Sequence, residues 1–167
     1  MASYYSSITD EQAELIKNSP LFFIATVASN PENISEGVGP INISPKGGVP
    51  LHIINPNRVA FLNYAGSGNE TELHSASGSP ITVMICSFEG EDAAIVRLYG
   101  RAKVIPTAES ALADQLLASR ATEMKLTPRH VVEIEVEKTS TSCGYGVPVM
   151  EFVRDRRTVD HGRRYKK

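Results

Sequence analysis

Short apolar runs separated by Gly, Pro and Asn dominate this chain of 167 residues, and most of them have the length of a strand. Residues 21–28 form a continuous apolar run that is rich in β-forming residues and short enough to be a buried strand. Residues 94–105 alternate, so we expect the even-numbered positions from Ala94 to Val104 to face inward. Gly100 interrupts this segment, which indicates a bulge or the close approach of another backbone. Further strands are expected at 40–44, 50–54, 58–64, 80–88 and 131–137, the last with an acidic outer face.

Few segments carry a helical signal. Thr9, with Gln12 three residues later, forms a capping box that predicts a first helix ending near Asn18. A short helix is expected at 69–77, and a leucine stripe predicts another at 107–119. Six or more short strands with two or three helices, and no alternation of strand and helix, favour a mainly β, antiparallel barrel over a parallel dinucleotide-binding sheet.

Length and composition predict one globular domain, because 167 residues with 41% hydrophobic content can bury a single core. Residues 154–167 carry a net charge of +5, and the first 153 residues carry a net charge of −7. We therefore expect residues 1–153 to form the domain and residues 154–167 a basic, flexible tail, which could also contact anions. The acidic body argues against a nucleic-acid partner.

The two cysteines have no CxxC partner, which disfavours a disulfide scaffold, a zinc site and dithiol chemistry. Cys86 lies in an expected buried strand, and Cys143 lies in a glycine-flanked turn. The first residues lack the basic start and apolar core of a signal peptide, and no apolar run approaches the roughly 20 residues that span a bilayer. The expected setting is cytoplasmic, without a membrane partner.

The segment 39–71 holds the most informative candidates for a binding site. Gly39 to Gly48 predicts a β-hairpin with its turn at residues 44–48, followed by a strand at 55–62 and a glycine-rich turn into a short helix at 66–71. Together these elements would supply edge backbone groups, one lysine and a helix N-terminus. Such a set suits a flat, phosphorylated cofactor.

The start of the expected short helix has two explanations. Free N–H groups and the positive end of the helix dipole between Ser67 and Thr71 would bind a phosphate. Ser67 and Glu70 also form a capping box, in which Glu70 occupies the same donors and repels an anion. The spacing alone leaves both explanations open.

Two further candidates also have alternatives. Lys46 is either a solvated loop lysine or a cation that neutralises a phosphate at the end of a cleft. Residues 142–148, with two glycines around Tyr145, suit either a tight turn or a backbone that lies flat against a planar ligand. The four histidines show no metal spacing, and no Ser-His-Asp or paired-carboxylate signature stands out. Neither a metal site nor hydrolytic chemistry is expected.

Five blocks follow one another in the order 22–26 (FFIAT), 39–47 (GPINISPKG), 66–71 (GSGNET), 97–102 (RLYGRA) and 141–148 (TSCGYGVP). In this order they resemble the pyridoxamine 5'-phosphate oxidase-like, FMN-binding split-barrel family, from about residue 20 to about residue 153. The resemblance implies a six-stranded antiparallel split β-barrel with short flanking helices. It also implies a homodimer that binds FMN noncovalently in clefts at the dimer interface.

The resemblance further implies a set of FMN contacts. The strand that faces the isoalloxazine ring would carry Asn42, Ile43 and Ser44, and the neighbouring strand would carry Asn63 and Tyr64. The phosphate would be approached by Ser67, Gly68, Asn69 and Thr71, with charge from Lys46 or from the partner subunit through Arg97 or Arg101. The remaining expected contacts are Cys143 and Tyr145.

This chain departs from the family at two places. Many members have basic residues where this chain has Glu70 and Thr71, so a cation from elsewhere must hold the phosphate. The C-terminal Arg-x-His element that grips substrate in pyridoxamine phosphate oxidases is not found, because His161 lies in the sequence Asp-His-Gly-Arg. Pyridoxamine phosphate is therefore not the expected substrate.

The favoured function is a dimeric FMN-dependent oxidoreductase that acts on a small molecule, with the flavin accepting or donating hydride. No catalytic side chain is assigned, because hydride transfer to or from the flavin needs no side chain as an acid or base. One alternative is a non-enzymatic protein that sequesters flavin or haem, and another is a flavin-free structural dimer. Turnover of a reduced nicotinamide or deazaflavin distinguishes the oxidoreductase from the sequestering protein. A colourless protein that gains no thermal stability with FMN would support the flavin-free structural dimer.

Overall fold

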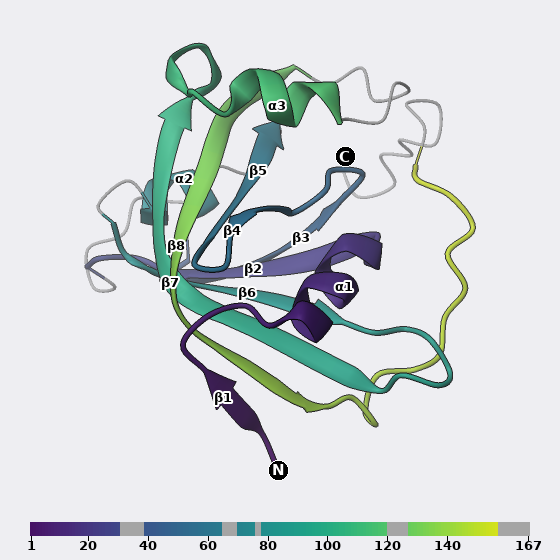
Figure 1. Cartoon of the computed structure of the whole chain (residues 1–167). Helices are drawn as coiled ribbons and strands as arrows, with labels where there is room; N and C mark the ends of the chain where they lie inside the picture. Colours follow the sequence, from purple (N-terminus) through teal and green to yellow (C-terminus); the bar gives the residue numbers. More distant parts are fainter. Residues whose placement is uncertain (31–38, 65–69, 76–77, 120–126, 157–167) are drawn as a thin grey trace, which may run out of the picture.

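The computed structural model describes residues 1–30, 39–64, 70–75, 78–119 and 127–156, and Figure 1 shows curved strands with short helices around them. The strands are β1 (Ser3–Tyr5), β2 (Leu21–Val27), β3 (Ile41–Gly47), β4 (His52–Asn55), β5 (Arg58–Tyr64), β6 (Pro80–Cys86), β7 (Ala94–Pro106) and β8 (Pro128–Cys143). The helices are α1 (Asp10–Asn18), α2 (Glu70–Ser75) and α3 (Ala113–Ala118), with a 3₁₀ turn at Thr107–Glu109 before α3.

All the described strands belong to one antiparallel sheet of eight strands. Its order is β3-β2-β6-β7-β8-β5-β4, and β1 adds to it by pairing with β8. Within the described residues β3 and β4 are the edges of this path, so the sheet does not close on itself. The mainly β, antiparallel split-barrel architecture expected from the sequence is confirmed.

The main core is built from alternate residues of the central strands. Ile24, Val83 and Leu98 of β2, β6 and β7 are fully buried, as the period-two patterns predict. Phe22 packs edge-on against Phe61 of β5, with ring centroids 5.3 Å apart. A second, smaller cluster forms where α3 contacts β5, at the top of Figure 1. The main cluster thus fills the space that the curved sheet encloses, and the smaller cluster fixes α3 to β5.

The first helix begins with the capping box that the sequence predicts. Thr9 Oγ1 accepts a hydrogen bond from the Gln12 N–H, and Gln12 Oε1 accepts one from the Thr9 N–H. The Gln12 side chain also donates to Thr141 Oγ1 of β8 at 2.9 Å. The cap therefore stabilises the helix end and attaches α1 to the sheet.

Gly100 allows the longest pairing in the sheet, that of β7 with β8. The register shifts between Tyr99 and Gly100, which confirms the expected bulge. A Cβ atom at position 100 would lie 1.9 Å from the backbone oxygen of Glu135. Only glycine permits this approach of the two backbones.

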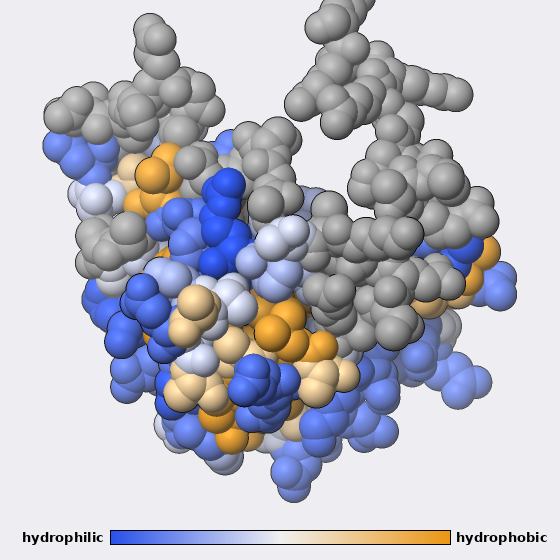
Figure 2. Space-filling view, turned by 90° about the horizontal axis from the view of Figure 1, so that it is seen from above, coloured by the Kyte–Doolittle hydropathy of each residue, from blue (hydrophilic) through white to orange (hydrophobic). Residues whose placement is uncertain are grey.

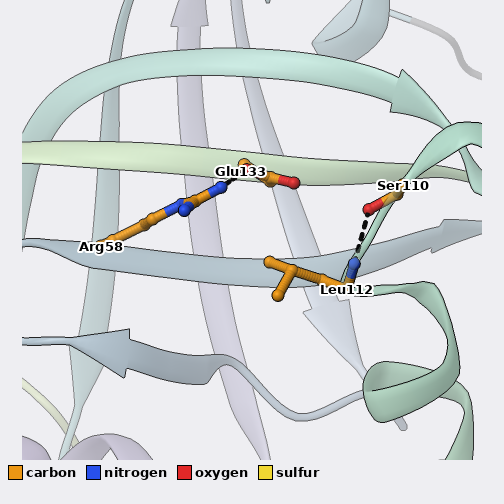
Figure 3. A network of polar contacts seen from close by, with 4 residues as sticks. All are labelled: Arg58, Ser110, Leu112 and Glu133. Atoms are coloured by element: carbon orange, nitrogen blue, oxygen red, sulfur yellow. Dashed lines mark hydrogen bonds and ion pairs between the residues drawn. The ribbon is translucent and has the colours of Figure 1, made fainter.

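The acidic outer face expected for residues 131–137 is only partly confirmed, because Glu133 is buried whereas Glu135 and Glu137 are exposed. Arg58 of β5 forms a salt bridge with Glu133 across the strand pair (Figure 3). The two residues are diagonal neighbours, since Arg58 lies opposite Glu135 in the register. The arginine compensates the desolvation of the buried carboxylate.

Two expected elements differ in the structure. The predicted hairpin turn at 44–48 is wrong: β3 continues to Gly47, pairs with β2, and places Lys46 opposite Phe22. An edge strand accepts Pro45, because one side of the strand has no ladder bonds to lose. The helix expected at 107–119 is divided, since Ser110 Oγ accepts a hydrogen bond from the Leu112 N–H between the 3₁₀ turn and α3 (Figure 3).

Apolar residues also reach the surface. On the face shown in Figure 2, hydrophobic residues lie in several separate areas among hydrophilic ones. The exposed apolar side chains include Ile41 and Ile43 on β3, each 69% exposed. Among the described helices none is long and apolar enough to cross a membrane.

Candidate functional site

Alternation along β3 gives this edge strand one polar and one apolar face. Asn42, Ser44 and Lys46 are half-buried on one side, and Ile41 and Ile43 are exposed on the other. The three polar residues therefore share a face. Ile43, which was expected to contact a ligand together with them, points to the opposite side.

Lys46 links two strands that lie far apart in the order of the sheet. Its ammonium donates a hydrogen bond to Asn63 Oδ1 of β5 at 3.3 Å. In the order of the sheet β3 is an edge and β5 lies next to the other edge, so this contact forms only because the sheet curves. Asn63 is buried, and the Tyr64 ring beside it packs against both apolar clusters. The strand that carries Asn63 and Tyr64 is therefore not the sheet neighbour of the Asn42 strand, as the sequence predicted, but meets it through Lys46 across the split of the barrel.

The charge of Lys46 is perturbed by its surroundings. Burial lowers its pKa below the ordinary value of 10.5, and the nearby Glu70 carboxylate acts in the opposite direction. Lys46 is therefore not the solvated loop lysine that its sequence context allowed. A half-buried ammonium with one neutral partner can accept an anion as a further partner at low desolvation cost.

Helix α2 lies over the same edge of the sheet and meets it through two side-chain contacts. Thr71 Oγ1 lies 3.5 Å from Asn42 Nδ2 of β3, and His74 Nδ1 lies 3.0 Å from Thr26 Oγ1 of β2. Thr71 and His74 are both buried. Because Thr26 lies opposite Asn42 in the strand register, the two contacts are side by side.

A third attachment joins α2 to β8. Glu72 Oε2 lies 3.3 Å from His130 Nδ1 and 3.6 Å from Arg129 Nη1. His130 is the cross-strand partner of Asn63, which accepts the bond from Lys46. Helix α2 therefore bridges the two sides of the split, with the polar face of β3 on one side and β8 with β5 on the other.

Other predicted cofactor contacts lie apart from this cluster in the single chain. Arg97 donates to Ser142 Oγ at 3.0 Å, and Arg101 is exposed and bonds Glu137 and the backbone oxygen of Gly78. Cys143 ends β8, and Tyr145 lies 87% exposed in the tight turn that follows. Of the remaining predicted contacts, Ser67, Gly68 and Asn69 lie outside the described residues.

The structure adds four residues that the sequence analysis did not assign to the site: Thr26, Glu72, His74 and His130. Thr26 lies in the otherwise apolar strand β2, whereas Glu72, His74 and His130 have polar neighbours in sequence, so none of the four stands out as a site residue. The spacing of Thr71 and His74, one helical turn apart, is the only sequence signal that links any of them to the site.

A separate cavity of about 350 Å³ lies between α1 and the ends of β6 and β7. Its lining includes the carboxylates Glu11, Glu14, Glu89 and Asp92 and no lysine or arginine. A phosphate would be repelled there, so the volume of this cavity does not make it the anion site. The Lys46 face, which has a cation and neutral amides, fits a phosphorylated ligand better.

Comparison with known proteins identifies relatives of the chain. Residues 8–143 match the family model described as pyridoxamine 5'-phosphate oxidase. The pyridoxamine 5'-phosphate oxidase family protein ustO of Aspergillus flavus is 29% identical over 161 residues, which cover 95% of this chain and 61% of the relative. The chain thus spans about three fifths of the length of this curated relative.

Three solved structures share the fold at low sequence identity. HupZ of Group A Streptococcus, as its H111A variant, has a TM-score of 0.60 and 22% identity, and the match covers 81% of this chain and 99% of HupZ. The haem storage protein HutZ of Vibrio cholerae has a TM-score of 0.51 and 16% identity, with 78% of this chain and 90% of HutZ covered. The FAD binding protein of Mycobacterium smegmatis has a TM-score of 0.50 and 17% identity, with 83% of this chain and 97% of that protein covered. The family model covers most of the chain, and the architecture agrees with it. The chain therefore belongs to the pyridoxamine 5'-phosphate oxidase family.

Proposed function

We propose that the protein is a flavoprotein that binds FMN noncovalently and uses it as an oxidoreductase on a small-molecule substrate. The observation that carries the proposal is the half-buried Lys46 ammonium, bonded to Asn63 across the split and located on the same face of β3 as Asn42. Membership of the family and the likeness to an FAD binding protein support a flavin as the ligand.

The residues of this face match the chemistry of FMN. The ammonium of Lys46 would pair with the phosphate, which is the only strongly charged group of the cofactor. Asn42 and Ser44 would offer side-chain hydrogen-bonding groups to the polar edge of the ring system. The outer edge of β3, which in the described residues pairs only with β2, leaves backbone groups for the same purpose.

The bound flavin would supply the hydride chemistry, and the protein would orient it and keep water from part of its surface. No side chain of the described cluster is required as an acid or base for that half-reaction. Lys46 holds a proton at Nζ, Asn63 fixes the direction of this ammonium, and α2 sets the distance between Lys46 and the opposing Glu70 charge.

A homodimer completes the proposal. The apolar face of β3, with Ile41 and Ile43 each 69% exposed, lies directly behind the polar face. A second copy that covers this face would remove apolar surface from water. Because β3 is an edge strand, such a copy could also reach past this edge to the ligand on the polar face. Arg97 or Arg101 of that copy could then supply the second cation that the phosphate needs.

The alternative is a protein that binds flavin or haem without turnover. The structural likeness to a haem storage protein favours it, and so does Glu70, whose carboxylate competes with a phosphate for Lys46. Against haem stands His74, which is buried against Thr26 and cannot ligate iron without rearrangement.

An absorption spectrum of the purified protein, followed by titration with FMN and with haem, tests the proposal. Flavin bands, saturable FMN binding and oxidation of a reduced nicotinamide by the FMN-loaded protein are the expected results. Saturable FMN binding without turnover of any reduced nicotinamide or deazaflavin would favour the binding protein. A Soret band with no affinity for FMN would overturn the flavin assignment.

A further inference from the structure

We propose that His74 is a positioning residue, whose buried bond to Thr26 fixes α2 on the sheet and thereby orients Asn42 on the flavin-facing strand. The inference rests on the proposed function, because it assigns the residue that holds the proposed site in shape. It concerns a buried histidine that neither the core nor the flavin chemistry explains.

The contacts form a brace between the helix and the sheet. Thr71 and His74 are one turn apart on α2, so they lie on the same face of the helix. Thr26 and Asn42 are register partners on adjacent strands, so they lie side by side on the sheet. The helix pair and the strand pair are joined by two contacts. Two contacts limit both the rotation of α2 about its axis and its sliding along the strands.

The two contacts differ in strength. The contact between Asn42 and Thr71 is 3.5 Å long and only partly buried, which is at the limit of a hydrogen bond. The contact between Thr26 and His74 is 3.0 Å long, and each of the two residues is 3% exposed. Water does not compete for the buried bond, so of these two contacts the His74 bond restrains α2 more strongly, and Asn42 follows the helix.

The other ring nitrogen of His74 adds no contact to the brace. Nε2 is buried and has no hydrogen-bond partner within the described part of the chain. The bond to Thr26 therefore uses Nδ1 alone, and either the ring nitrogen or the hydroxyl can donate its proton. His74 thus acts on α2 through one directional, buried bond.

The position of α2 bears on the ligand face at two points. Thr71 contacts the amide of Asn42, and Glu70 brings its carboxylate within electrostatic range of Lys46. If the helix moves, the amide loses a partner and the charge beside Lys46 changes. Only part of the molecules would then hold the binding-competent arrangement, and the apparent affinity would fall in proportion.

The double variant Thr26→Val/His74→Phe tests this role, because it replaces both partners by apolar groups of similar shape. Such an exchange removes the directional bond and the unpaired Nε2 together, so the unfolding midpoint should stay at or above that of the wild type. The FMN dissociation constant should nevertheless rise roughly fivefold, the factor expected for one lost hydrogen bond. Tyr99→Phe, which removes a contact with Ser140 outside the site, serves as the control and should leave the affinity unchanged.

Rescue separates positioning from a general packing role. His74→Asn can place an amide near the former Nδ1 and should restore most of the affinity, whereas His74→Gln places its amide near Nε2 and should not. Equal affinities of the wild type and the double variant would overturn the inference. So would a loss of affinity that matches a loss of global stability in every variant.

A further experiment distinguishes failure of the proposed FMN function from failure of the role proposed for His74. If the wild type binds no FMN, that function is rejected, and amide hydrogen exchange in the ligand-free protein still tests the brace. Exchange at residues 70–75 should be faster in the double variant than in the wild type, while exchange in β7 stays unchanged. Unchanged exchange in α2 would reject the role of His74.

Discussion

Lys46 shows how one residue acquires a new property from its place in the fold. In the sequence it lies between a proline and two glycines, which suits a solvated turn. In the structure it lies on an edge strand, half-buried and bonded to a residue on the opposite side of the split. The desolvated ammonium is the strongest candidate for an anion contact in the described part of the chain.

Replacing Lys46 by methionine keeps the length of the apolar stem and removes the charge. We expect FMN binding to weaken by about 1 to 3 kcal/mol, the range for loss of a charge-assisted hydrogen bond. Isothermal titration calorimetry measures this change. Riboflavin, which lacks the phosphate, should bind both proteins alike, and Lys103→Met on the exposed side of β7 should have no effect. An unchanged FMN dissociation constant in Lys46→Met would contradict the phosphate contact.

The pH dependence follows from the lowered pKa of Lys46. Its folded-state pKa lies below 10.5, so the unfolded chain binds more protons in the window between the two values. Stability of the ligand-free protein should therefore gain from this group as the pH rises through that window. FMN affinity should fall over the same window, because the neutral amine no longer attracts the phosphate. Both trends should be absent in Lys46→Met, as denaturant titrations and FMN titrations at several pH values would show. Equal slopes in both proteins would assign the titration to another group.

At the scale of elements, the pairing of β7 with β8 depends on Gly100. These strands form the longest ladder of the sheet, and the register shift at Gly100 brings the backbone of Glu135 against it. The bulge increases local twist, which helps the sheet to curve. That curvature brings β3 towards β5 and thereby makes the Lys46 contact with Asn63 possible.

Gly100→Ala should destabilise the protein by about 1 to 3 kcal/mol, because the added methyl group meets backbone atoms that cannot move without breaking the ladder. Gly90→Ala is a matched control, since a Cβ atom there meets nothing within 4 Å. Chemical denaturation of both variants measures the difference. Equal midpoints for the two variants would show that β8 can shift without cost.

At the scale of the whole molecule, the unpartnered apolar face of β3 bears on assembly. We expect a dimer at micromolar concentration, because Ile41 and Ile43 lie on an edge strand that a second copy can cover. Sedimentation velocity of the wild type should show a dimer, and Ile43→Lys should shift it to monomer and weaken FMN binding. Asp114→Lys, an exposed charge change on α3, should leave the dimer intact. A stable monomeric wild type would remove the interface model of the site.

Local sequence patterns determined most of the elements. The capping box of α1, the burial of alternate residues in β7 and the bulge at Gly100 each leave a local signature in the sequence: a residue spacing, an alternation and an isolated glycine. The resemblance added the architecture and the strand that carries Asn42 and Ser44, because the order of several blocks is more specific than any one block. The turn predicted at 44–48 failed, since its proline and glycines are also compatible with an edge strand.

Only the tertiary structure decided how the site is assembled. Lys46 meets Asn63 through the curvature of the sheet, and His74 meets Thr26 through the docking of α2. Both contacts join residues that are distant in the sequence, and no local pattern distinguishes a buried, bonded histidine from an exposed one. The chain thus determined by itself which segments become strands and which residue types they carry. The curvature of the sheet and the packing of one short helix determined which of those residues face one another, because these contacts depend on the geometry of the whole fold.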